Sequence, residues 1–147
     1  MPTHHETRKL PYTAQQMYDL VADVESYPEF LPWTAAARVR DRRQTRRGEV
    51  MEADLVISFK VFRERFRSEV TLRPDDMKIE TEYVTGPFRH MNSIWTFIER
   101  EKGCEVTFDV DFEFKNRILG SAASMFFNDA MQRIVRAFER RAAHLYG

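Results

Sequence analysis

The residues from Arg117 to Tyr146 form an uninterrupted amphipathic pattern that constrains the whole chain. Apolar side chains recur every three or four positions, from Leu119 through Ile134 to Leu145, and polar side chains fill the opposite side. No proline interrupts this segment, which predicts a single helix roughly 40 Å long at ~1.5 Å per residue. No earlier segment is long enough to be a helical partner, so the apolar face of the helix must pack against a sheet.

Most of the preceding chain alternates between apolar and polar residues with the period of two that is typical of strands with one buried face. The clearest example runs from Cys104 to Phe114, where the even-numbered residues are apolar. Short connections such as Pro74-Asp75-Asp76 and Glu101-Lys102-Gly103 predict hairpins, and therefore antiparallel pairing. The other predicted strands span Glu6 to Leu10, Ala37 to Arg43, Ala53 to Lys60, Glu64 to Arg73, Met77 to Tyr83 and Met91 to Phe97.

A shorter helix is predicted from Ala14 to Val24. Thr13 and Gln16 before and within it have the spacing of a capping box, in which the hydroxyl and the amide each satisfy a free backbone N–H. The order is therefore one strand, one helix, about six strands and a long helix. This order predicts an α+β fold in which a curved antiparallel sheet of about seven strands wraps around the C-terminal helix, and a length of 147 residues suits one domain over residues 1–147.

The composition argues against several classes of protein. Lysine plus arginine and aspartate plus glutamate both number 23, which gives no support for general polyanion binding, and we expect no DNA partner. Cys104 is the sole cysteine, so we expect neither an internal disulfide nor a cysteine metal cluster. No apolar run approaches the ~20 residues that a membrane span needs. The N-terminus lacks a signal or transit pattern, and the expected location is the cytoplasm, with peripheral contact to the inner membrane as an option.

The sequence contains no recognisable catalytic constellation. The four histidines are scattered, and Cys104 falls on the apolar face of its predicted strand, where a thiol packs as a small hydrophobic group. We find no glycine-rich phosphate loop, Ser-His-Asp arrangement or metal-ligand spacing. The sequence therefore predicts no catalytic residue, metal or cofactor.

The inward face of the predicted sheet is rich in aromatic side chains. A curled sheet and a straight helix do not fit each other perfectly, so the gap is filled either by side chains or by a ligand. The pattern leaves a solid aromatic core and a ligand cavity open as alternatives. The candidate lining residues are Phe59, Phe66, Tyr83, Trp95, Phe97, Phe108, Phe127 and Met131.

The segment from Tyr27 to Trp33 places four large apolar side chains beside two prolines, which is unusual for a solvent-exposed loop. In one interpretation Tyr27, Phe30, Leu31 and Trp33 close the end of the core. In the other they form a mouth that admits a long apolar chain and touches a bilayer.

Two groups of arginines stand out. A solvated face neutralised by nearby acids is one interpretation, and binding to anionic lipid headgroups or to ribosomal RNA phosphates is the other. The first group follows one predicted strand and turn, and the second lies on the C-terminal helix: Arg38, Arg40, Arg42, Arg43, Arg46 and Arg47, then Arg133, Arg136, Arg140 and Arg141.

Four segments of the chain resemble the coenzyme Q-binding family of START-like, helix-grip proteins: Leu10 to Trp33, Gly86-Pro87-Phe88-Arg89, Trp95-Thr96-Phe97 and Phe112-Glu113-Phe114. The first is long and fairly specific, the others are short, and the likeness covers nearly the whole chain. Thr34 stands where members of the family often have cysteine.

The resemblance implies a carrier or chaperone that binds ubiquinone between sheet and helix and supports respiration without making a new bond. Tyr83, Ser93 and Trp95 would then be candidates to position the quinone head. The bacterial branch of the family includes ribosome-association toxins of toxin–antitoxin pairs, which implies a ribosome-binding inhibitor of subunit joining as an alternative. Polyketide cyclases and dehydratases share the architecture, so an enzyme with an acid or base in the cavity is a third option. The missing transit pattern fits a bacterial member.

Overall fold

The computed structural model describes residues 3–59, 62–86 and 88–147, with the backbone alone at positions 59, 62 and 117–128. Within these residues the chain forms seven strands, two α-helices and one 3-10 helix. Their bounds are β1 Thr3–Leu10, α1 Ala14–Ala22, η1 Val24–Glu29, β2 Thr34–Thr45, β3 Gly48–Phe59, β4 Phe62–Arg73, β5 Lys78–Thr85, β6 Phe88–Arg100, β7 Gly103–Phe114 and α2 Arg117–Tyr146.

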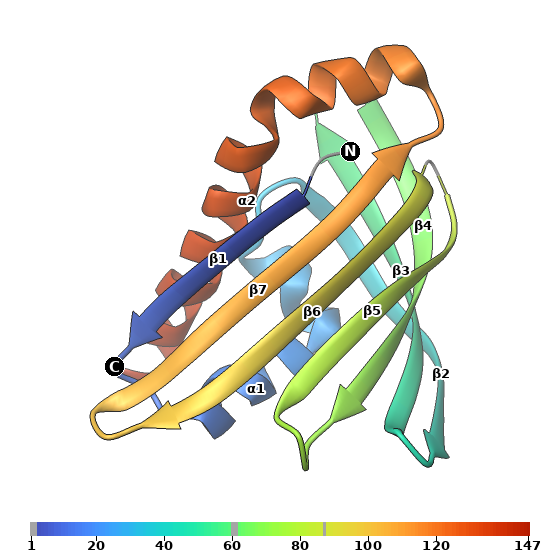
Figure 1. Cartoon of the computed structure of the whole chain (residues 1–147). Helices are drawn as coiled ribbons and strands as arrows, with labels where there is room; N and C mark the ends of the chain where they lie inside the picture. The colour runs from blue at the N-terminus through green and yellow to red at the C-terminus, as the bar shows by residue number, and fades with distance from the viewer. Residues whose placement is uncertain (1–2, 60–61, 87) are drawn as a thin grey trace.

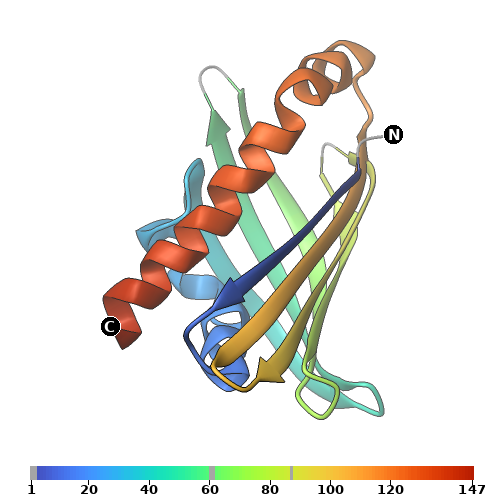
Figure 2. The ribbon, with the colours of Figure 1, turned by 60° about the vertical axis from the view of Figure 1, so that its left-hand side comes forward.

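The strands form one curved sheet in the order β1-β7-β6-β5-β4-β3-β2, and every neighbouring pair is antiparallel. Figure 1 shows this sheet with α1 and α2 on its concave side, and in Figure 2 α2 lies diagonally across the open side. The helix-grip fold that the sequence predicts is therefore confirmed, and α2 has the predicted bounds.

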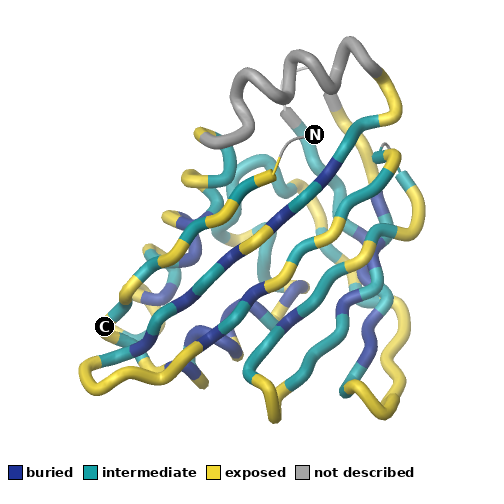
Figure 3. The backbone as a smooth tube through the Cα atoms, in the orientation of Figure 1, coloured by how far each residue is buried: buried dark blue, intermediate teal, exposed yellow. Residues whose placement is uncertain are grey.

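The predicted alternation in β7 is also confirmed. The apolar even-numbered residues from Cys104 to Phe112 are buried against the helices, and Asp109 between them is exposed. Figure 3 shows the same alternation along the backbone of β7. Trp95 of β6 lies opposite Phe108 of β7, and their rings stack with centroids 4.3 Å apart.

These rings belong to a core aromatic group, which we define as Tyr18, Trp95, Phe97, Phe108 and Phe138. Phe138 of α2 is 3% exposed and approaches Trp95 with ring centroids 5.0 Å apart. Tyr18 of α1 meets Phe97 edge-on at 5.6 Å. The core aromatic group thus holds both helices against β6, on which Phe108 of β7 also stacks.

The N-terminus of α1 has the predicted capping box. The Gln16 N–H donates to the Thr13 hydroxyl at 3.0 Å, and the Thr13 N–H donates to the Gln16 side chain at 2.9 Å. A further bond ties the helix to the sheet, because the Ala14 N–H donates to the Glu99 carboxylate of β6 at 2.7 Å.

Most ends of the predicted strands and of the short helix are wrong by one to five residues; the longest extensions are β3, which begins at Gly48 rather than Ala53, and β6, which spans Phe88–Arg100 rather than Met91–Phe97. Helix α1 ends at Ala22 rather than Val24, because the chain turns at Asp23 into the 3-10 helix η1. Strand β1 begins at Thr3, since its pairing with β7 continues to the end of the described chain. Strand β2 covers Thr34–Thr45, and two register shifts in its pairing with β3 obscure the alternation that would have marked its ends.

The register of β7 gives a direct test of the fold. Phe108→Asp should lower the free energy of unfolding by more than about 3 kcal/mol, because it removes a buried ring and buries an unpaired charge. Asp109→Ser is the matched control, since Asp109 is exposed and pairs only with the exposed His5 among the described residues; its effect should stay within about 0.5 kcal/mol. Equal losses in urea unfolding would contradict the register.

Candidate functional site

A second aromatic cluster occupies the inner face of the sheet at the end where β7 leads into α2. We call it the Phe88 group; it consists of Phe66, Tyr83, Phe88, Phe112 and Phe114. The Phe88 ring lies 5.4 Å from Phe66, 5.4 Å from Tyr83, 5.7 Å from Phe112 and 4.8 Å from Phe114, centroid to centroid. Phe66 and Phe112 are buried, but Tyr83, Phe88 and Phe114 are only half-buried. The Phe88 group is therefore less completely covered than the core aromatic group.

Two polar groups accompany these rings. Ser68 of β4 is 2% exposed, and its hydroxyl has no hydrogen-bond partner within the described part of the chain. It lies opposite Tyr83 of β5 in the sheet, and the Tyr83 hydroxyl accepts a bond from the Phe88 N–H at 3.2 Å. A buried hydroxyl without a partner costs free energy of folding.

The structure divides the predicted lining residues between the two clusters. Phe66 and Tyr83 belong to the Phe88 group, whereas Phe97 and Phe108 belong to the buried core. Trp95 also lies in the core, with Ser93 half-buried two residues before it on the same strand face.

Of the three remaining predicted lining residues, only Met131 has a described side chain. Met131 of α2 is half-buried and packs against the core. The side chains of Phe59 and Phe127 lie outside the described residues, so their predicted role in lining a cavity stays a prediction.

Sequence reasoning did not select Phe88 or Ser68 as site residues. Phe88 belongs to the Gly86-Pro87-Phe88-Arg89 motif, but alternation does not place it inward, because a register shift separates it from His90 in its pairing with β7. The alternation of β4 does point Ser68 inward, but alternation cannot show that its hydroxyl would lack a partner.

The segment from Tyr27 to Trp33 packs against the C-terminal half of α2. The rings of Tyr27 and Phe30 lie 5.4 Å and 5.2 Å from the ring of Phe138. Burial raises the pKa of the Tyr27 phenol, whose O–H donates to the Val21 carbonyl. Arg141 lies above the Phe30 ring, 5.2 Å from its centroid. These contacts favour the interpretation in which the segment closes the end of the core.

Leu31 and Trp33 complete this segment. Leu31 is half-buried against the core. Trp33 has a φ of 62°, a left-handed conformation that is strained for a bulky side chain. The Ser58 N–H donates to the Trp33 carbonyl at 2.8 Å and so holds the turn from η1 into β2 against β3.

Several arginines of the first predicted group are neutralised. Arg40 lies 3.4 Å from Asp54, Arg42 lies 3.1 Å from Glu49, and Arg43 lies 3.5 Å from Glu69. Much of strand β2 is thus solvated and ion-paired.

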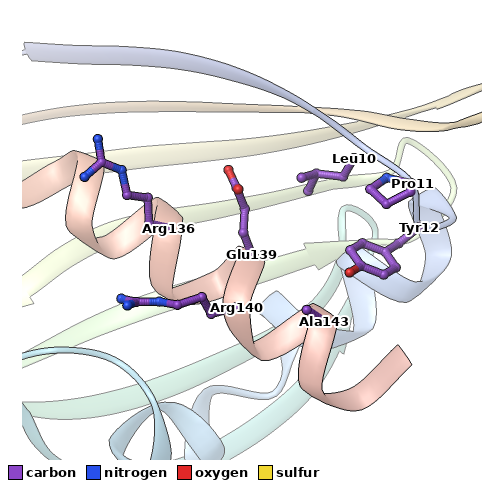
Figure 4. A pocket seen from close by; sticks show the side chains of 7 residues that line it. All are labelled: Leu10, Pro11, Tyr12, Arg136, Glu139, Arg140 and Ala143. Carbon is purple, nitrogen blue, oxygen red and sulfur yellow. The ribbon is translucent and has the colours of Figure 1, made fainter. Parts of the chain in front are cut away.

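The second group divides between ion pairs and a surface groove. Arg133 pairs with Asp129 at 3.0 Å, and Arg141 pairs with Glu29 at 3.6 Å. Arg136 and Arg140 instead line a groove of ≈ 410 Å³ between α2 and the turn after β1. Figure 4 shows this groove, which is lined by Leu10, Pro11, Tyr12, Arg136, Glu139, Arg140 and Ala143. Leu10 of this groove pairs with Cys104 near the start of β7, whereas Phe114 of the Phe88 group lies at the end of that strand, so the two are at opposite ends of the sheet.

The only cysteine of the chain is poorly placed for catalysis. Cys104 is buried, and its burial, with a smaller contribution from the charge of Glu99, raises the pKa of the thiol to about 11. Among the described residues, no three histidine, cysteine, aspartate or glutamate side chains gather as a metal site would require. No described helix is both long and apolar enough to cross a membrane.

Comparison with known proteins adds the family. The model of the family described as polyketide cyclase / dehydrase and lipid transport matches residues 10–139. The chain belongs to this family. A ribosome association toxin RatA from Rickettsia prowazekii is 36% identical to it over 97% of both chains. The coenzyme Q-binding protein COQ10 homolog B of Xenopus laevis is 33% identical over 98% of the chain, which spans 59% of that longer protein. The solution structure of an 18 kDa protein from Caulobacter crescentus has 31% identity and a TM-score of 0.83, and covers 100% of this chain and 99% of that one.

The packing of Phe30 generates a prediction that separates the two interpretations of its segment. Phe30→Ala should lower the free energy of unfolding by about 2–3 kcal/mol, because a half-buried ring loses its contacts with Tyr27 and Phe138. Phe30→Leu keeps most of the apolar volume and should cost less than half as much. Unfolding curves for both variants would show this order. A negligible loss for Phe30→Ala would favour the mouth.

The burial of Cys104 predicts slow chemistry at its sulfur. With a pKa of about 11, about one thiol in a thousand is ionised at pH 8, and the ring-rich core also blocks access. Ellman's reagent should therefore modify the native protein far more slowly than the protein in guanidinium chloride. Rapid modification of the native protein would show that Cys104 is accessible and would reopen a catalytic role for it.

Proposed function

We propose that this protein is a carrier that binds an isoprenoid quinone, with ubiquinone as the expected ligand, between the Phe88 group and α2. The observation that carries the proposal is the pairing of half-buried aromatic rings with the unpartnered Ser68 hydroxyl on the inner face of the sheet. The lipid-transport family and the relative named as a coenzyme Q-binding protein support the same ligand class.

The rings would bind the apolar part of the ligand. Tyr83, Phe88 and Phe114 are only half-buried, so part of each side chain remains accessible. Covering apolar surface stabilises a complex by ~25 cal/mol per Å², so an isoprenoid chain laid over these rings would contribute most of the affinity. The quinone ring could also stack on one of them, since aromatic pairs favour offset or edge-on contact.

The hydroxyls would orient the head group. Ser68 would donate to one quinone carbonyl oxygen and so satisfy a hydrogen bond that is otherwise missing inside the protein. Tyr83 accepts from the Phe88 N–H, so its own O–H hydrogen can donate to the ligand. Ser93 is a further polar candidate on the inner face, while Trp95 would support the site from the core below. The ligand would be shielded and transferred without any covalent step.

The test begins with mass spectrometry of an organic extract of the purified protein. Ser68→Ala should reduce the quinone bound per folded protein several-fold, because the head group loses its donor. The same variant should unfold at an unchanged or slightly higher denaturant concentration, because replacing an unpaired buried hydroxyl by a methyl group relieves its cost.

Ser58→Ala is the matched control, because Ser58 sits in the neighbouring strand β3 on the outer face, beyond Val56 in the same alternation. It should leave the quinone content unchanged. Phe88→Ala should also reduce quinone content, with a smaller loss of stability than a fully buried ring would give. A full quinone load in Ser68→Ala and Phe88→Ala, or no quinone in the unaltered protein, would refute the proposed site.

A second function has a specific observation in its favour, namely the full-length match to a relative named as a ribosome association toxin. We propose as the alternative that the protein binds a ribosomal subunit and hinders subunit joining. Adding the purified protein to separated subunits should then reduce the joined particles in a sucrose gradient. Unchanged joining at a large molar excess of protein would eliminate this alternative.

A further inference from the structure

A second, smaller pocket lies on the outer face of the sheet, on the side away from the Phe88 group. It has a volume of ≈ 290 Å³ and combines three arginines and one aspartate with small apolar side chains. Its lining residues are Ala36, Ala37, Arg38, Arg40, Asp54, Val56 and Arg65. They come from the neighbouring strands β2, β3 and β4.

The strand register explains why these residues meet. Val56 of β3 lies between Ala36 of β2 and Arg65 of β4. In the next outward row, Asp54 of β3 lies opposite Arg38 of β2. Ala36 and Val56 thus form an apolar floor with Arg65 beside it and Arg38 in the next row, and the strand pairing holds this arrangement.

Asp54 organises the cations but does not neutralise all of them. It is 7% exposed, its carboxylate accepts from Arg67 at 2.9 Å, and Arg40 lies 3.4 Å away. Burial acts to raise the pKa of Asp54, but the hydrogen bond from Arg67 and the charges of Arg67, Arg40 and Arg65 outweigh it, so the pKa is lowered and Asp54 stays ionised. Within the described residues, Arg38 and Arg65 have no ion-pair partner.

The surrounding charges show that this positive site is local. Further along β2, Arg42 and Arg43 are paired with acids. On the other side of the outer face, β7 presents Asp109, Asp111 and Glu113. A long polyanion lying across the sheet would meet these carboxylates, whereas a single phosphate in the pocket would not.

We propose that this pocket binds the phosphate headgroup of an anionic phospholipid and so docks the protein on a membrane surface. Unpaired guanidinium groups recognise phosphate oxygens with paired N–H donors, and the floor of Ala36 and Val56 suits the carbons of the glycerol unit. The site is separate from the quinone site and lies on the opposite face of the sheet, so either can be present without the other.

The experiment is flotation of the purified protein with two kinds of vesicle, phosphatidylcholine alone and phosphatidylcholine mixed with phosphatidylglycerol. We expect binding to the mixed vesicles only, falling as salt is raised. Arg38→Gln combined with Arg65→Gln should weaken this binding roughly fivefold for each arginine. Arg40 is left in place because it pairs with the buried Asp54.

The matched control is Arg46→Gln combined with Arg47→Gln, which removes the same charge from the exposed β2–β3 turn outside the pocket. It should keep nearly full vesicle binding, and both double variants should keep the unfolding midpoint and quinone content of the unaltered protein. Equal losses in the two double variants would overturn the proposal in favour of diffuse charge, and no loss in either would overturn it outright. Tighter, pocket-dependent binding to an RNA oligonucleotide than to the vesicles would also overturn the lipid assignment.

Discussion

The packing of Phe138 is the contact on which the rest of the molecule depends. From the C-terminal half of α2, this one ring reaches Trp95 of the sheet and both Tyr27 and Phe30 of the segment around η1. Three parts of the chain that are distant in sequence are thereby fixed to one another, and the helix is anchored at one end of the sheet. Because aromatic contacts of this kind are directional as well as apolar, they fix the angle of α2 along with its position.

The other end of the sheet is covered less completely. There Phe66 and Phe112 are as buried as the rings of the core aromatic group, but Tyr83, Phe88 and Phe114 are only half-buried. Ser68, on the same inner face, is buried without a hydrogen-bond partner among the described residues. A buried polar group without a bond is a cost that stable folds usually avoid, so its presence beside half-covered rings is what separates a candidate ligand site from an ordinary core.

The sequence was sufficient for the architecture because period-two and helical patterns report directly on burial. The alternation in β7 and the long helical repeat of α2 each specify which side chains face inward, and both were predicted correctly. The same patterns could not place Phe88, because alternation counted back from Trp95 puts it on the outer face and a register shift between Phe88 and His90 turns it inward. The start of β2 and the turn at Trp33 were also beyond reach, because register shifts and a left-handed residue break the periodicity on which such reasoning rests.

The two faces of the sheet follow different physical rules, and this permits two separate binding sites on one small fold. On the inner face, affinity would come from covering apolar surface, which depends little on salt. On the outer face, affinity would come from arginines that outnumber the nearby carboxylates, and salt would weaken this binding. Strand alternation keeps the two apart at the level of single residues: in β4, Phe66 and Ser68 point inward while Arg65 and Arg67 point outward. Under the two proposals, the protein would meet a charged membrane surface with one face while its apolar ligand stayed on the other.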